Sequence, residues 1–201
     1  MSDISSGWSV VLDLERLRAL EGEPLERELE LPPFSFQYWG QSYELEGPAK
    51  VSLFASLSEG ELIVWGQMRA TLRTACGRCL GPALFEVDEP FTFVYREGLP
   101  VELEEEHQIA EGEENEVLVG SLVGKLDVAH QLEEVLILGI PPKVVCSELC
   151  RGICPSCGKN LNEGDCSCSL EAGDPRLSAL KELLEGGGDA HGRAEEEDEQ
   201  S

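Results

Sequence analysis

Residues 145–168 read VCSELCRGICPSCGKNLNEGDCSC and contain six of the eight cysteines in this chain of 201 residues. These six are Cys146, Cys150, Cys154, Cys157, Cys166 and Cys168. The other two, Cys76 and Cys79, stand far upstream in TACGRCLGP. Because four thiolates complete one tetrahedral zinc site, this set predicts one or two structural zinc ions. With two ions, one of them would join distant parts of the chain.

The spacing of the cysteines suggests how they divide. In CPSCG, Gly158 frees the backbone for the tight turn that aims N–H groups at the sulfur atoms. The simplest local set is Cys154, Cys157, Cys166 and Cys168, which leaves Cys76, Cys79, Cys146 and Cys150 as the second set. A competing partition places Cys150 in the C-terminal set and leaves one or two thiols spare. The sequence does not separate these partitions, and a site of four thiolates is in either case closed and structural.

Other uses of these cysteines are alternatives to zinc binding. Cys76-Gly-Arg-Cys79 has the spacing of a thioredoxin-type redox motif, which needs a low-pKa thiolate at a helix N-terminus. Here Gly81-Pro82 and an alternating run follow, so the pair lies on a turn between two strands and metal is favoured. An iron–sulfur cluster also takes four cysteines, but nothing in the chain favours redox chemistry. The plainest alternative is that some are buried small hydrophobes or that one site has decayed.

Hydrophobic periodicity predicts an α+β fold, which is a mainly antiparallel β unit over residues 8–96 with a few helices and a Cys-rich zinc-binding C-terminal segment. The expected strands are 8–14, 29–31, 51–57, 62–72, a further pair at 84–87 and 91–95, and 117–123. The expected helices are 14–20, one capped by Asp127 and stopped by Pro141-Pro142, and 174–184. Glu59-Gly60 reads as a hairpin turn.

Three regions follow from this pattern. Residues 1–145 form a β-rich domain with an acidic loop at 101–116. Residues 146–185 form a Cys-rich zinc module and C-terminal helix packed on the same domain. Residues 186–201 form an acidic, disordered tail.

The chain is strongly acidic, with a formal net charge of -25. This charge argues against non-specific binding to nucleic acid or to an anionic membrane, and it favours a basic partner. Residues 101–116 carry eight Glu and no Lys or Arg, which is typical of solvated chain, although an acidic arm for a basic protein is the sharper alternative. No signal peptide or membrane span is evident, and clustered reduced cysteines favour a cytoplasmic location.

A small basic patch is the candidate for direct contact with RNA. Its members are Arg69, Arg73, Arg78, Arg151 and Lys159. Arg69 and Arg73 share one face of a strand, although a solvated face opposite the core is the favoured explanation for them. For catalysis, His107 and His191 fall in acidic segments and His130 in a helix, and no nucleophile–base constellation stands out. We therefore expect no enzyme.

The ordered motifs resemble a known family. They are Cys76-Gly-Arg-Cys79-Leu80, Leu126-Asp127 with Glu133-Glu134, Pro141-Pro142, Cys146, Cys150-Arg-Gly-Ile-Cys154-Pro-Ser-Cys157-Gly158-Lys-Asn160-Leu161-Asn162, Cys166-Ser-Cys168 and Asp174-Pro-Arg176. Over about residues 8–184 the chain resembles the YceD-like family of bacterial and plastid large ribosomal RNA subunit accumulation proteins, with Ile153 where Leu is usual. Some members lack the C-terminal cysteines, which implies that this cluster supports the fold.

The resemblance implies a role in accumulation or processing of the large-subunit ribosomal RNA, and no known catalytic activity. Together with the charge, it predicts a non-enzymatic factor in large ribosomal subunit biogenesis. Its expected partner is a basic ribosomal protein or a pre-ribosomal particle. The alternative, direct binding of naked RNA through the basic patch, is the less favoured one.

Overall fold

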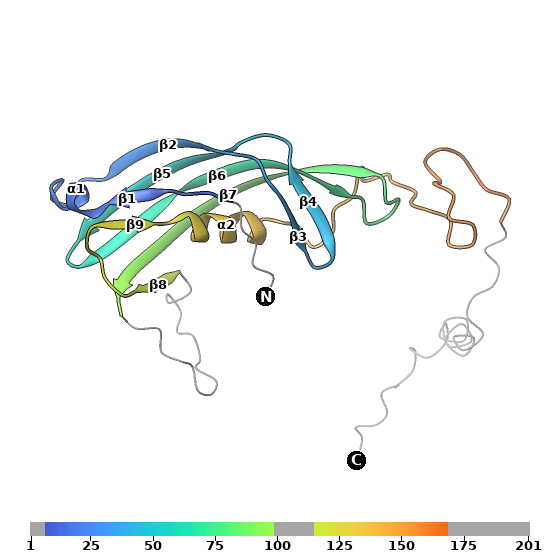
Figure 1. The fold of residues 1–201 in the computed structure, drawn as a ribbon. Coiled ribbons are helices and arrows are strands. Elements are labelled where there is room, and N and C mark those ends of the chain that lie inside the picture. The colour runs from blue at the N-terminus through green and yellow to red at the C-terminus, as the bar shows by residue number, and fades with distance from the viewer. Residues whose placement is uncertain (1–6, 99–114, 169–201) are drawn as a thin grey trace, which may run out of the picture. The chain divides into compact units, whose positions relative to one another are not determined.

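The computed structural model describes residues 7–98 and 115–168 of the chain (Figure 1). The chain divides into two compact units, and the division falls between Arg151 and Gly152. This is six residues beyond the boundary expected from the sequence, because Cys146 and Cys150 gather with Cys76 and Cys79 in the first unit. Most of the acidic loop, the expected helix at 174–184 and the acidic tail lie outside the described residues.

The first unit is built on a seven-stranded sheet with a second, two-stranded sheet beside it. The large sheet consists of β2 (Leu25–Leu31), β3 (Ser35–Tyr38), β4 (Gln41–Leu45), β5 (Ala49–Ser58), β6 (Glu61–Ala75), β7 (Pro82–Glu97) and β8 (Glu116–Val119). Their order is β2-β5-β6-β4-β3, with β7 paired to β6 and β8 paired in parallel to β7. The small sheet pairs β1 (Val11–Asp13) with β9 (Lys125–Asp127). The helices are α1 (Leu14–Arg18) and α2 (Ala129–Leu138).

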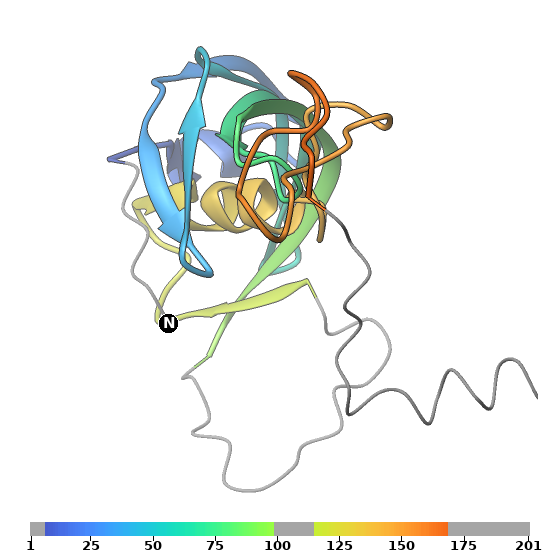
Figure 2. The same cartoon turned by 90° about the vertical axis from the view of Figure 1, so that its right-hand side faces the viewer.

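The core lies between the inner face of the large sheet and α2 (Figure 2). Leu62, Val64 and Met68 are buried at alternate positions of β6, as the period of two predicts. On α2, Leu132 and Leu136 are buried against them. The predicted α+β class, mainly antiparallel with a few helices, is therefore confirmed.

The predicted pair of strands at 84–87 and 91–95 is wrong, because the structure has one strand of 16 residues, β7. The register runs unbroken along β6, with Gln67 opposite Pro90. The amide of Val94 donates outward to Asn115, so the amides of even-numbered residues face the outer edge of the strand. Proline at position 90 therefore removes an outward donor and costs no bond to β6.

Sequence reasoning also missed the hairpin of β3 and β4. The two residues at its tip, Trp39 and Gly40, both have positive φ, at 51° and 75°, as a type I′ turn requires. Trp39 is 89% exposed there. An aromatic residue is unusual at such a position, which normally takes Asn, Asp or Gly, so the turn signal was not recognised.

Asp127, expected as the helix cap, lies one residue early, and Val128 holds the cap position of α2. Because Asp127 ends β9 beside β1, its Oδ1 accepts the amides of Val10 and Ala129 at 2.9 and 3.0 Å. The hydroxyl of Ser9 donates to Oδ2 at 2.8 Å. Partial burial alone would raise the pKa of Asp127, but these donors hold the pKa below its usual value.

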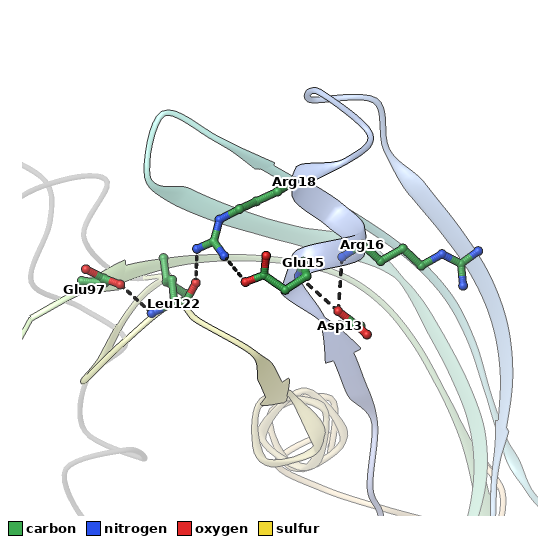
Figure 3. Close-up of polar contacts among 6 residues, drawn as sticks. All are labelled: Asp13, Glu15, Arg16, Arg18, Glu97 and Leu122. Carbon is green, nitrogen blue, oxygen red and sulfur yellow. Dashed lines mark hydrogen bonds and ion pairs between the residues drawn. The ribbon is translucent and has the colours of Figure 1, made fainter.

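Polar contacts fix α1 against the chain that follows β8 (Figure 3). Asp13 caps α1 by accepting the amides of Glu15 and Arg16 at 3.1 and 3.2 Å. Arg18 donates to the carbonyl of Leu122 and to Glu15, and the amide of Leu122 donates to Glu97 at 2.7 Å. Within residues 7–98 and 115–168, no helix is long and apolar enough to span a bilayer.

Candidate metal centres

The first group of cysteines brings together two parts of the chain that are distant in sequence. Cys76 and Cys79 lie on the turn between β6 and β7, as predicted, and Cys146 and Cys150 follow α2. All four sulfur atoms lie within 4.8 Å of one another. The sulfur of Cys76 is 3.8 Å from that of Cys150, and the sulfur of Cys79 is 3.6 Å from that of Cys146. This group could hold one metal ion.

Backbone hydrogen bonds shape the turn that carries the upstream pair. The amide of Cys76 donates to the carbonyl of Gly81 at 2.7 Å, and the amide of Leu80 donates to that of Cys76 at 3.0 Å. Leu80 takes a φ of 61° to close this turn. The amide of Gly77 donates to the carbonyl of Val144 at 2.9 Å and ties the turn to the downstream pair.

Backbone donors stabilise the thiolate form of Cys76. Burial raises its pKa, but backbone donors outweigh burial and lower it to about 6. Two of these donors are the amides of Arg78 and Cys146, at 3.4 and 3.3 Å from the sulfur. Hydrogen bonds from Cys150 and Cys79, together with burial, raise the pKa of Cys146 to about 12. A bound dication would favour the thiolate form of all four.

Arg78 reinforces the first group from the side. Its Nη1 donates to the carbonyls of Glu148 and Cys150, both at 3.0 Å. The guanidinium therefore fixes the loop between Cys146 and Cys150. Sequence reasoning assigned Arg78 to RNA contact and did not foresee this internal role, because the pairing depends on contact between residues some seventy positions apart.

The second group lies in the second unit and has the local membership that spacing favoured. The sulfur atoms of Cys154, Cys157, Cys166 and Cys168 all lie within 4.8 Å of one another, and the group could hold one metal ion. The amide of Gly158 donates to the carbonyl of Cys154, and the amide of Cys154 to that of Lys159, both at 2.9 Å. Gly158 has a φ of 72°, the conformation expected of it.

The electrostatics of the second group repeat those of the first. Backbone amides of Cys157 and Ser156 lower the pKa of Cys154 to about 6. Hydrogen bonding to Cys157, followed by burial, raises the pKa of Cys168 to about 12. The groups differ in burial. Three of the four thiols in the first group are buried among Ala83 and Val144, whereas only Cys154 is buried in the second.

Among the candidate RNA contacts, Arg69, Arg73, Arg78 and Lys159 each have a partner within the protein. Arg69 is ion-paired with Asp88 at 3.0 Å, and Arg73 is ion-paired with Glu46. Lys159, in the second unit, donates to the carbonyl of Asp165 at 2.7 Å. Arg151 is exposed at the end of the first unit. Strand register places Arg69 opposite Asp88 and Arg73 beside Glu44, so acidic side chains accompany the two strand arginines.

Only one of the histidines considered for catalysis lies among the described residues. His130 is exposed on α2, and His107 and His191 lie outside the described residues. The carboxylate of Asp127 accepts hydrogen bonds from the backbone amides of Val10 and Ala129. These hydrogen bonds explain why an acidic residue stands at this position.

The structure therefore defines a β-sheet protein with two clusters of four cysteines, each of which could hold a metal ion. The family model described as "Large ribosomal RNA subunit accumulation protein YceD" matches residues 64–184, a range that includes all eight cysteines. The chain belongs to this family. The family takes its name from accumulation of the large ribosomal RNA subunit.

Individual relatives match the chain over only part of its length. The chain is 32% identical over 63 residues to "Large ribosomal RNA subunit accumulation protein YCED homolog 1, chloroplastic" of Arabidopsis thaliana, which covers 31% of this chain and 20% of that protein. It is 31% identical over 132 residues to uncharacterized proteins of Mycobacterium bovis and Mycobacterium tuberculosis (strain ATCC 25618 / H37Rv), covering 64% of this chain. The chain thus spans a fifth of the plastid relative and 58% of the mycobacterial ones. No solved structure matches it.

Proposed function

We propose that this chain is a non-enzymatic factor in large ribosomal subunit biogenesis that acts by binding a basic ribosomal protein, alone or on a pre-ribosomal particle. The family match over residues 64–184 is the observation that carries the pathway. Support for a protein partner comes from charge, since a net charge of -25 attracts basic proteins and repels bare RNA.

The surface of the sheet supports the same partner. Glu26, Glu28 and Glu30 are exposed at alternate positions along β2. Across the sheet, Arg69 and Arg73 are already engaged with Asp88 and Glu46. Carboxylates therefore outnumber available cations on this face. Phosphate binding needs the opposite arrangement.

We further propose that both cysteine groups hold zinc and that the ions are structural. Four thiolates complete a tetrahedral shell and leave no position for water or substrate. Backbone amides already stabilise one thiolate in each group, which suits a thiolate-bound dication. Iron–sulfur chemistry also takes four thiolates, so metal analysis of the purified chain, with absorption spectra to detect a cluster, tests the identity of the metal.

Depletion of the protein from cells tests the pathway. We expect a selective fall in the ratio of large- to small-subunit ribosomal RNA, with unprocessed precursor ends on the large species. An unchanged ratio would contradict the proposed role.

Binding experiments test the partner. Affinity for a basic ribosomal protein should fall as salt rises, while naked ribosomal RNA should bind weakly. Tight binding to naked RNA would favour the RNA-binding alternative instead.

A further inference from the structure

Residues of β7 and α2 line a groove in the first unit. Figures 1 and 2 show the helix beside the strand. The volume of the groove is about 410 Å³. The residues that line it include Glu89, Phe91, Phe93, Asn115, Val135 and Leu138. Neither cysteine group contributes to it, so the metal centres leave its role unexplained.

The floor and rim of the groove are apolar. Phe91 and Phe93 stack with their ring centroids 5.9 Å apart, and Val135 is buried beside them. Leu138, the last residue of α2, is 83% exposed. A Cβ on Gly139 would lie 2.6 Å from Val87, so the absence of a side chain at this position lets the helix end pack directly on β7. This close packing holds Leu138 at the rim, where it presents apolar surface to solvent.

Among the described residues, the charged side chain at the groove is acidic. Glu89 belongs to its wall, and none of the described residues that line it is Lys, Arg or His. The carboxyl-terminal end of α2 lies there, and its last turn has no basic residue. Since the C-terminal end of a helix carries a partial negative charge, a cation is favoured at this place.

The edge of β7 beside the groove is open within the described structure. β8 pairs with β7 only from Val94 to Glu97. Upstream of Val94, no described strand lies along this edge. Outward amides and carbonyls of Asp88 and Thr92 therefore line the approach to the groove, interrupted by Pro90. An extended chain can reach the groove along this edge.

We propose that this groove docks an extended basic segment of a partner protein. An apolar side chain of the segment lies against Phe93 and Leu138, and a neighbouring Lys or Arg lies toward Glu89 and the C-terminal end of α2. The proposal rests on the proposed function, because a basic ribosomal protein would supply such a segment. It goes further by naming the surface and the chemistry of the segment.

The test uses the full chain, labelled with ¹⁵N, and short peptides that alternate Lys with Leu, Lys with Ser, or Glu with Leu. We expect only the Lys–Leu peptide to bind well and to shift the amide signals of residues 89–93 and 135–139. Leu138→Lys should weaken this binding about tenfold, since an apolar contact is lost and a like charge is added. Val123→Lys is the matched control, because Val123 is 64% exposed and lies outside the groove.

Several results would overturn the proposal. Equal binding by the Leu138→Lys and Val123→Lys variants would do so, as would peptide-induced shifts confined to other surfaces. Concentration-dependent shifts of residues 89–93 without peptide would assign the groove to a second copy of the chain. Shifts there on deletion of residues 100–113, with no peptide binding, would assign it to the chain's own acidic segment.

Complementation in depleted cells separates failure of this inference from failure of the proposed function. If depletion leaves the ribosomal RNA ratio unchanged, the proposed function fails. If depletion lowers the ratio and the Leu138→Lys variant restores it as fully as Val123→Lys, the function stands and the groove proposal fails. Loss of rescue by Leu138→Lys alone supports both.

Discussion

Replacing Cys79 with serine should remove one metal ion and destabilise the first unit. Cys79 and Cys146 are 67 residues apart, and closing a loop of that length lowers the entropy of the unfolded chain by an amount worth about 4 kcal/mol. This value is a ceiling, because β7 and α2 already hold the same segment. For the second group, the corresponding loop runs from Cys154 to Cys168 and is worth about 3 kcal/mol. Only the loss of stabilisation at the first group should lower the stability of the sheet, because the second group lies in the second unit.

Tryptophan fluorescence can separate the two effects, because all three tryptophans, Trp8, Trp39 and Trp65, belong to the first unit. The assay combines metal content per chain with urea unfolding followed by tryptophan emission. Cys79→Ser should lose one ion and shift the unfolding midpoint strongly. Cys157→Ser should lose one ion and leave the tryptophan transition in place. Equal shifts for the two variants, or two ions retained in either, would refute this reasoning.

Three further predictions concern the sheet and its charges. Asp127→Asn should cost about 1 kcal/mol at pH 7. Because the folded pKa of Asp127 is depressed, its contribution is present above the unfolded pKa of about 4 and is lost as pH falls through the folded pKa, so urea midpoints of the two proteins should converge in acid. Gly66→Ala should disrupt pairing of β5 with β6, since the new Cβ would lie 1.9 Å from the carbonyl oxygen of Ser52, and soluble yield with thermal melting would show it. Charge reversal at Arg69 and Arg73 should leave the weak association with ribosomal RNA in filter binding unchanged, and a clear loss would support the RNA-binding alternative.

Sequence reasoning located the features that depend on short spacing. The period of two along β6 predicts its buried face, and the two-residue gaps between cysteines predict tight turns at Cys76 and Cys154. Such signals succeed because the residues that interact are neighbours in the chain. The grouping of Cys76 with Cys150 was harder, since it requires the strand turn to meet the chain after α2. Counting four cysteine ligands for each ion suggested that grouping, but only the fold brings the sulfur atoms together.

The errors arose where tertiary context overrides a local signal. The sequence predicted two strands, at 84–87 and 91–95, but the nitrogen of Pro90 between them faces outward, so β7 continues through it. Trp39 was not recognised as a turn residue, because its left-handed conformation is uncommon for an aromatic. The internal role of Arg78 depends on carbonyls at positions 148 and 150, which no local pattern connects to it. Its positive charge was the reason for predicting that Arg78 contacts RNA.

Because Arg69 and Arg73 are ion-paired and the cysteines gather in two groups, we expect contact with a partner on the acidic and apolar surface. The groove that we propose for docking is lined by residues of the first unit, and β7 is held by continuous pairing with β6 throughout the groove. Its shape should therefore survive loss of metal from the second group. We expect Cys157→Ser to bind the Lys–Leu peptide with unchanged affinity in the same titration. A large loss in that variant would mean that the second cysteine group contributes to binding as well as to stability, which a closed structural site does not explain.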